Sequence, residues 1–211
     1  MRNQTDNFLD GIQISQLGQA ISASYCAVSL AKLGADVIKI GQQVANLPDS
    51  KIRQSESRLR RDIDPINLAL NHSKKSVTIN WNTPKGHASL EHILASTDLL
   101  ITDGSIDEYG TSIQDLMTRN PSLVIVSIFP FRPGHRYDSY ATSDLSLFHM
   151  SGNAHGMLGP VENPEQEPPI RAGGQQTEMV SGLTAATAAM IGMYRKQRTG
   201  HGCHIIVSKF E

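Results

Sequence analysis

The feature that most constrains the fold is a direct passage from a helical pattern into a strand, in the run SLAKLGADVIKI at residues 29–40. Apolar residues at helical spacing stop at Gly34, and helices commonly end at a glycine in a left-handed conformation. Val37, Ile38 and Ile40 follow at once, and such β-branched residues are typical of a buried parallel strand. The run therefore predicts an α-to-β joint of a layered α/β domain.

The same alternation of helix and strand recurs along the chain. Apolar or alternating patterns predict strands at 12–17, 36–40, 76–80, 98–102, 123–129 and within 199–208. Helical patterns predict helices at 20–32, from an N-cap at Thr83 to about 95, at 113–119 and from about 179 to 197. Such alternation produces a mainly parallel, doubly wound sheet flanked by helices. The predicted fold class is thus α/β and Rossmann-like.

Two segments interrupt this alternation. Residues 42–67 lose apolar periodicity and gather charge in RLRRD at 58–62, so an irregular excursion is expected there. Residues 152–176 are rich in Gly, Pro, Asn and Glu, which predicts a long loop, and loops of that length are often functional. The chain stops at KFE directly after the last predicted strand, as expected of a fragment of a longer fold.

Composition limits the classes of function. The 211 residues are 39% hydrophobic, which is adequate for a globular core. Lysine and arginine number 19 against 20 acidic residues, and this balance gives no general attraction to nucleic acid or to anionic membrane. Cys26 and Cys203 lie far apart and outside any CxxC pattern, which argues against a disulfide scaffold. No signal peptide or membrane-spanning run is evident, so the expected location is the cytoplasm.

Several familiar site motifs are missing from the sequence. The first strand-to-helix turn reads QLGQAISAS with Gly18 alone, so it lacks the GxGxxG of a dinucleotide site, and no Walker phosphate loop occurs. The GxSxG of a hydrolase nucleophile elbow is also missing. His201 and His204 flank Cys203, but adjacent strand residues point to opposite faces. No metal site is therefore predicted.

A basic cluster, NHSKK at 71–75, precedes the strand predicted at 76–80. Its Lys74 and Lys75 could meet the phosphate groups of a nucleotide-like ligand. The alternative is a solvated loop that holds two lysines, and composition alone favours this alternative. The same two interpretations apply to RLRRD at 58–62.

The carboxylate of Glu178 lies at the start of the last long helix, directly after the GGQQ turn at 173–176. A helix N-terminus favours an ionised carboxylate. In a glycine-walled site that admits a ligand, such a group could attack a thioester carbonyl and carry the acyl group covalently. The alternative is ordinary capping at the N-terminus of a helix.

Several blocks resemble, in the same order, the class III CoA-transferases, which include formyl-CoA transferase, the carnitine CoA-transferase and α-methylacyl-CoA racemase. These blocks are LAKLGADVIKI (30–40), LNHSKKSVTINWNTPKGHASL (70–90), STDLLITD (96–103), NPSLVIVSIFPF (120–131) and RKQRTGHGCHIIVS (195–208). The resemblance implies that residues 1–211 are a single α/β unit, the N-terminal part of the family's Rossmann-like large domain. It also implies a partner, either an interlocked second copy or a polypeptide that supplies the smaller second domain.

The resemblance further implies a reaction and its nucleophile. The family's catalytic aspartate lies four residues before a glycine of the long helix, and the matching residue is Glu178, before Gly182. The carboxylate is kept but is one methylene longer. In the transferases this group attacks the acyl-CoA thioester, forms a mixed anhydride, and passes CoA to an acceptor acid through an enzyme-bound thioester.

By the same resemblance, Asn71, Lys74 and Lys75 are expected near the CoA phosphates, and Asp103 lies in the turn that matches a CoA-contacting segment. Acyl-CoA and a carboxylic acid are then substrates, and no permanently bound cofactor is expected. Two alternatives remain. One is a non-catalytic CoA-binding or oligomerising module. The other is a racemase or isomerase, although the histidine of the racemases is replaced here by Ser143.

Overall fold

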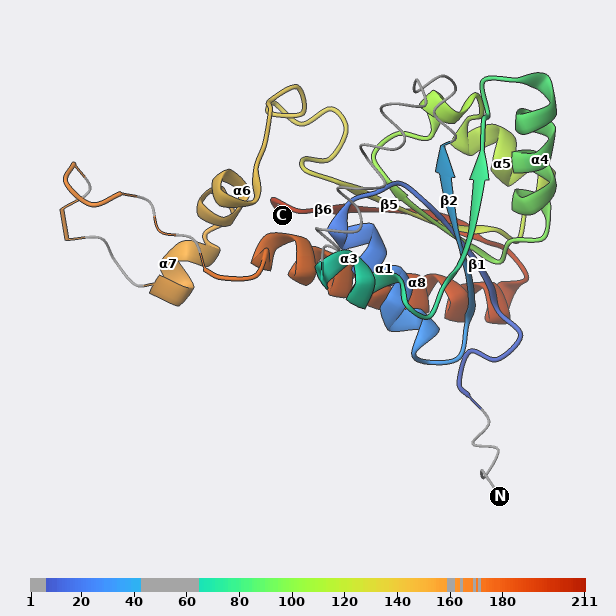
Figure 1. Cartoon of the computed structure of the whole chain (residues 1–211), viewed down its shortest axis with the longest axis horizontal. Coiled ribbons are helices and arrows are strands. Elements are labelled where there is room, and N and C mark those ends of the chain that lie inside the picture. The colour runs from blue at the N-terminus through green and yellow to red at the C-terminus, as the bar shows by residue number, and fades with distance from the viewer. Residues whose placement is uncertain (1–6, 43–64, 159–161, 164, 169, 171) are drawn as a thin grey trace, which may run out of the picture.

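The computed structural model describes residues 7–42, 65–158, 162, 163, 165–168, 170 and 172–211. Most of the excursion expected at 42–67, including RLRRD at 58–62, lies outside these residues. The described part forms one α/β structure built on a single sheet (Figure 1).

The sheet has six parallel strands in the order β3-β2-β1-β4-β5-β6. The strands are β1 (Gln13–Leu17), β2 (Asp36–Gln42), β3 (Lys75–Ile79), β4 (Leu99–Asp103), β5 (Val124–Phe129) and β6 (Cys203–Ser208). The chain moves outward from β1 to β3 and then returns to place β4 on the other side of β1. The α/β, doubly wound prediction is confirmed, and the reversal between β1 and β4 creates the crevice where such sheets bind ligands.

Helices cover both faces of the sheet (Figure 1). The helices are α1 (Ile21–Ala31), α3 (Pro65–Asn71), α4 (Pro84–Ala95), α5 (Ile113–Arg119), α6 (Asp144–Met150), α7 (Asn153–Leu158) and α8 (Gln176–Thr199), with a short 3-10 turn η1 (Asp107–Tyr109). Side chains of α1 and α8 share one core cluster with one face of the strands, whereas α4, α5 and η1 share a second cluster with the other face. Figure 1 shows α6 and α7 in the part of the chain that extends away from the sheet.

The joint at 29–40 forms as its sequence predicts. Gly34 has a φ of +105°, and a Cβ at this position would lie 2.2 Å from Cβ of Asn7. The N–H of Gly34 donates to the carbonyl of Ala31 and that of Ala35 donates to Leu30, which is the hydrogen-bond pair of a Schellman motif. Helix α1 therefore ends in an ordered turn that leads directly into β2.

Helix α8 packs closely on α1 because its contact face is made of small residues. Ala185 and Ala189 are fully buried, and a Cβ on Gly182 would lie 2.6 Å from the carbonyl oxygen of Ser22. A Cβ on Gly192 would lie 2.7 Å from Val124 on the sheet. The close helix packing expected from these residues is confirmed, and it brings the N-terminal ends of α1 and α8 together.

The structure corrects the prediction of a long loop at 152–176. Helix α7 occupies Asn153–Leu158, and α8 begins at Gln176, three residues before the expected start. Helix α3, which begins at Pro65 within the stretch 42–67 that was expected to be irregular, was not predicted, and neither was α6. The first turn of α6 is stabilised by a reciprocal capping box between Ser143 and Ser146. Helices this short carry too few apolar positions to show a period, so local capping and tertiary contacts decide them.

Candidate functional site

The first part of the site is the turn between β1 and α1. The carboxylate of Asp103, at the end of β4, accepts hydrogen bonds from the N–H groups of Gln19 at 2.7 Å and Ala20 at 2.5 Å. Gly18 has a φ of +106°, and a Cβ there would lie 1.7 Å from Asp103 Oδ1. Burial raises the pKa of Asp103, against these two hydrogen bonds. Asp103 thus caps α1 at the crevice, and only glycine fits the turn beside it.

The second part is a pair of lysines between the sheet, α1 and α3. Lys74 Nζ lies 2.8 Å from Gln16 Oε1, 2.9 Å from the carbonyl oxygen of Ser24 and 3.2 Å from Asn71 Oδ1. Lys39 Nζ reaches the same Asn71 oxygen at 3.3 Å. The structure therefore brings the predicted residues Asn71 and Lys74 together and adds Lys39 and Gln16 to them.

The two lysines have lowered pKa values, because they are partly buried and because Lys39 also repels Lys74. Burial, and then the charge of Lys39, lowers the pKa of Lys74 from 10.5 to about 7. Burial also lowers the pKa of Lys39, although Asp103 opposes that shift. The neutral oxygens around Lys74 satisfy its hydrogen bonds without neutralising it. An anionic group such as a phosphate would do so, and it would raise both pKa values.

Lys75 lies apart from this pair. Its Nζ forms a salt bridge with Asp36 at 2.7 Å, and its side chain is 68% exposed. It is the first residue of β3, which Lys74 precedes, and the two lysines have different partners, Asp36 for Lys75 and Gln16 for Lys74. Its predicted contact with CoA stays a prediction.

The third part is Glu178, in the first turn of α8. Its Oε2 accepts the N–H of Ser22 at 3.0 Å, and its Oε1 lies 2.5 Å from Nζ of Lys209. Burial raises the pKa of Glu178, but the charge of Lys209 and the hydrogen bonds from Lys209 and Ser22 outweigh burial and leave it below its ordinary value. Glu178 is consequently ionised at neutral pH, beside the N-terminal ends of two helices.

The backbone that carries Glu178 is held from α6. Thr177 donates its N–H to Asp144 Oδ1 at 3.1 Å, and Gln175, which precedes α8, has a φ of +57° that non-glycine residues rarely adopt. Ser143, which stands at the position of the racemase histidine, uses its hydroxyl to cap α6. The start of α8 is thus fixed by residues outside the sheet.

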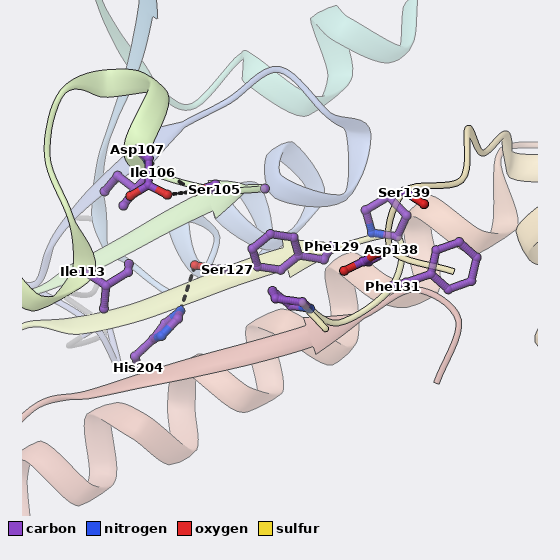
Figure 2. A pocket seen from close by; sticks show the side chains of 13 residues that line it. Ser105, Ile106, Asp107, Ile113, Ser127, Phe129, Phe131, Asp138, Ser139 and His204 are labelled. Carbon is purple, nitrogen blue, oxygen red and sulfur yellow. Dashed lines mark hydrogen bonds between the residues drawn. The ribbon is translucent and has the colours of Figure 1, made fainter. Parts of the chain in front are cut away.

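A cavity of about 600 Å³ lies on the opposite face of the sheet, beside β5 and β6. Figure 2 shows His204 of β6 directed at Ser127 of β5, with their hydrogen bond of 3.0 Å, and Phe129 and Phe131 further along the cavity. Burial lowers the pKa of His204, so its ring is neutral at pH 7. Among the described residues, the lining contains aromatic, hydroxyl and acidic side chains but neither lysine nor arginine.

Sequence reasoning missed Gln16, Lys39, Ser22 and Lys209. Lys39 had left a signal, because a lysine within the apolar run VIKI is unusual for a buried strand. The contact of Lys209 with Glu178 joins residues 31 positions apart and had no signal in the sequence.

The described residues contain no group of three or more His, Cys, Asp or Glu side chains placed to hold a metal ion. Their helices include none that is both long and apolar enough to cross a membrane.

Comparison with known proteins connects this arrangement to one family. The family model described as CoA-transferase family III matches residues 9–211. Succinyl-CoA–D-citramalate CoA-transferase of Chloroflexus aurantiacus is 25% identical over 206 residues, which cover 96% of this chain and 49% of that protein. Succinyl-CoA:glutarate CoA-transferase of Mus musculus is 27% identical, over 93% of this chain and 44% of that protein.

The fold agrees with this relationship. The crystal structure of a CAIB/BAIF family protein from Brucella suis matches with a TM-score of 0.80 at 23% identity, over 97% of this chain and 53% of that one. The chain thus spans about half the length of the relatives it matches. Because the family model covers almost the whole sequence, the chain belongs to CoA-transferase family III.

Proposed function

We propose that this chain takes part in the transfer of coenzyme A between an acyl-CoA and a carboxylic acid, with Glu178 as the nucleophile. The observation that carries the proposal is a partly buried, ionised carboxylate at the carboxyl edge of the sheet, fixed by Ser22 and Lys209. An ionised carboxylate that is partly shielded from water is a competent nucleophile toward a thioester. The CoA-transferases among the relatives make a thioester the expected substrate.

The proposed reaction exchanges acyl groups between oxygen and sulfur. A Glu178 oxygen attacks the thioester carbonyl, and the C–S bond breaks to give a mixed anhydride and CoA thiolate. The thiolate attacks Cδ of Glu178, which releases the first carboxylate and leaves a glutamyl-CoA thioester. The acceptor carboxylate then attacks Cδ and displaces CoA thiolate, which gives a second mixed anhydride. The thiolate attacks the acceptor's acyl carbon, the C–O bond to Glu178 breaks, and the Glu178 carboxylate is released. No electron is gained or lost overall, so the steps balance without an oxidant or reductant.

We place the phosphates of CoA on the α1 side of the crevice. Lys39 and Lys74 supply positive charge there, and Asn71 holds both amines through one oxygen. Asp103 contributes by shaping the turn into α1, whose Gln19 and Ala20 N–H groups it already binds. Lys75, exposed beyond Lys74, adds longer-range attraction that salt screens.

Because the chain spans about half of its relatives, we propose that the acyl and acceptor pockets are completed by an interlocked second copy or by a polypeptide that carries the second domain. Succinyl-CoA is the first donor to test, since it appears in the names of two relatives.

The test is intact-protein mass spectrometry after brief incubation with succinyl-CoA. The expected result is a covalent CoA adduct that disappears in Glu178→Gln and persists in Glu162→Gln, the same chemical change at an exposed position. An adduct that survives in Glu178→Gln contradicts the assignment of the nucleophile. No adduct in the wild-type chain, alone or with its completing polypeptide, contradicts CoA transfer.

One observation favours a second function, a CoA-binding module without catalysis. Lys209 occupies one of the two Glu178 oxygens in an ion pair whose side chains are only 8% and 16% exposed. If Oε2 also stays held by the N–H of Ser22, the carboxylate only positions α1 and α8. Calorimetric titration with CoA separates the two functions, because binding without any adduct supports the module.

A further inference from the structure

Lys209 has an unusual position beside the nucleophile. It directly follows β6, and its backbone N–H donates to the carbonyl of Phe129 at 2.8 Å, so its placement is set by the sheet. Its Nζ lies 2.5 Å from Glu178 Oε1, and its side chain is 8% exposed. Within the described part of the chain, Glu178 is the only hydrogen-bond partner of this ammonium group.

The two oxygens of Glu178 are not equivalent. Oε1 is paired with the Lys209 ammonium, whereas Oε2 accepts a neutral N–H from Ser22 at 3.0 Å. Hydrogen bonds to a charged donor are about twice as strong as neutral ones, so the lone pairs of Oε1 are the more firmly held. Oε2 is therefore the better nucleophile, and Oε1 becomes the carbonyl oxygen of the acylated side chain.

The proposed reaction removes the negative charge from this ion pair and then restores it. In the mixed anhydride, Glu178 is neutral, and the buried Lys209 ammonium has lost its counter-ion. When the CoA thiolate attacks Cδ, the C–S bond forms and the electron pair of the C=O bond moves onto Oε1. The negative charge thus returns to the atom that Lys209 already contacts.

We propose that Lys209 is a second catalytic residue, whose ammonium stabilises the oxyanion formed on Oε1 each time that CoA thiolate or a carboxylate attacks Cδ of Glu178. This inference rests on the proposed function. Lys209 keeps all its protons throughout: the oxyanion collapses, the bond to the leaving carboxylate or thiolate breaks, and Oε1 becomes a carbonyl oxygen again. A donor that is already buried and oriented needs no reorganisation as charge develops.

The test is the single-turnover rate of the Glu178-linked CoA adduct from succinyl-CoA. Removal of one preorganised oxyanion donor commonly lowers a rate by about 100-fold to 1,000-fold, and we expect a loss of this size in Lys209→Met. Lys209→Arg, which keeps the charge, is expected to recover part of the rate. In Lys209→Ala, added ethylammonium is expected to restore part of it as well.

The pH dependence separates this role from a simpler one. If Lys209 only keeps Glu178 ionised, the deficit of Lys209→Met vanishes at pH 9, where the carboxylate ionises without help. If Lys209 stabilises the oxyanion, the deficit persists at pH 9. The matched control is Lys196→Met, which removes the 2.6 Å ion pair with Asp98 toward the other end of α8 and is expected to leave the rate per folded molecule unchanged.

Each outcome bears on a different claim. A Glu178-dependent adduct that forms in Lys209→Met within threefold of the wild-type rate at pH 9 overturns the role of Lys209 and leaves the proposed function intact. An adduct that never forms in the wild type overturns the proposed function, and this inference falls with it. If Lys209→Met does not fold, Lys209→Arg and the ethylammonium rescue decide the question.

Discussion

The two faces of the sheet near its carboxyl edge differ sharply in charge. On the α1 side lie two lysines with lowered pKa values and an ionised Glu178 paired with Lys209. On the other side lies a cavity whose described lining has aromatic side chains and a neutral His204 but no lysine or arginine. One face is suited to an anionic ligand, whereas the other is suited to an apolar or neutral group.

The register of the strands explains why the two faces of the sheet differ in charge. Gln16 pairs with Lys39 on one side and with Ile101 on the other, and Asp103 lies two residues beyond Ile101 on the same face. Thr102 pairs with Ser127 on the opposite face. Since successive side chains alternate, a shift of one position moves a residue from the charged face to the cavity. A residue at the carboxyl edge therefore belongs to the charged site only if its side chain points to the α1 face.

The largest expected effect compares Glu178 with His204, one residue from each face. Glu178→Gln is expected to lower the rate of CoA transfer by at least about 1,000-fold, because it removes the nucleophile. His204→Gln keeps a polar group in the cavity and is expected to change the rate less than threefold. Steady-state assays of both variants measure this, and a similar loss in both would refute the assignment of the site to one face.

The next effect compares two glycines that both have positive φ values. Gly18→Ala places a methyl group 1.7 Å from Asp103, whereas Gly104→Ala meets no atom within 4 Å. We expect roughly 1 kcal/mol of destabilisation from backbone strain at either position, and about 2–3 kcal/mol more at position 18 from displacement of the α1 cap. Urea unfolding measures both, and equal losses would show that Asp103 does not set the turn.

A smaller effect is expected for CoA affinity at Lys74. Lys74→Met is expected to weaken CoA binding by about 30-fold at pH 6, since it removes a charge-assisted contact with phosphate. A lysine with a pKa of about 7 is protonated below that pH and neutral above it, so wild-type affinity should fall as the pH rises from 6 to 9. Titration calorimetry across this range would disprove the idea if both proteins gave the same slope.

The smallest effect is expected at Lys75, whose exposed side chain lies apart from Lys39 and Lys74. Lys75→Met breaks a surface salt bridge with Asp36, and the affinity for CoA should fall less than threefold. The change should disappear in 0.5 M salt, because screening removes longer-range attraction. A loss as large as that of Lys74→Met would place Lys75 in direct contact with the ligand.

Much of the fold could be predicted from local sequence patterns. The joint at Gly34, the N-cap at Thr83 and the apolar strand at 124–129 form as their sequences predict, because each depends on neighbouring residues. The short helices α6 and α7 were missed. They contain too few residues for an apolar period and are held by capping and tertiary contacts.

The candidate site could be predicted from the sequence only in part. The sequence by itself determined the α/β alternation, the family and the candidate residues Glu178, Asn71, Lys74, Lys75 and Asp103. The tertiary structure decided which of them share a face, separated Lys75 from Lys74, and brought Lys209 against Glu178. The physical reason is that patterns of period two or 3.6 report only one element, whereas pKa values and ion pairs depend on burial and on neighbours that the sheet order brings together.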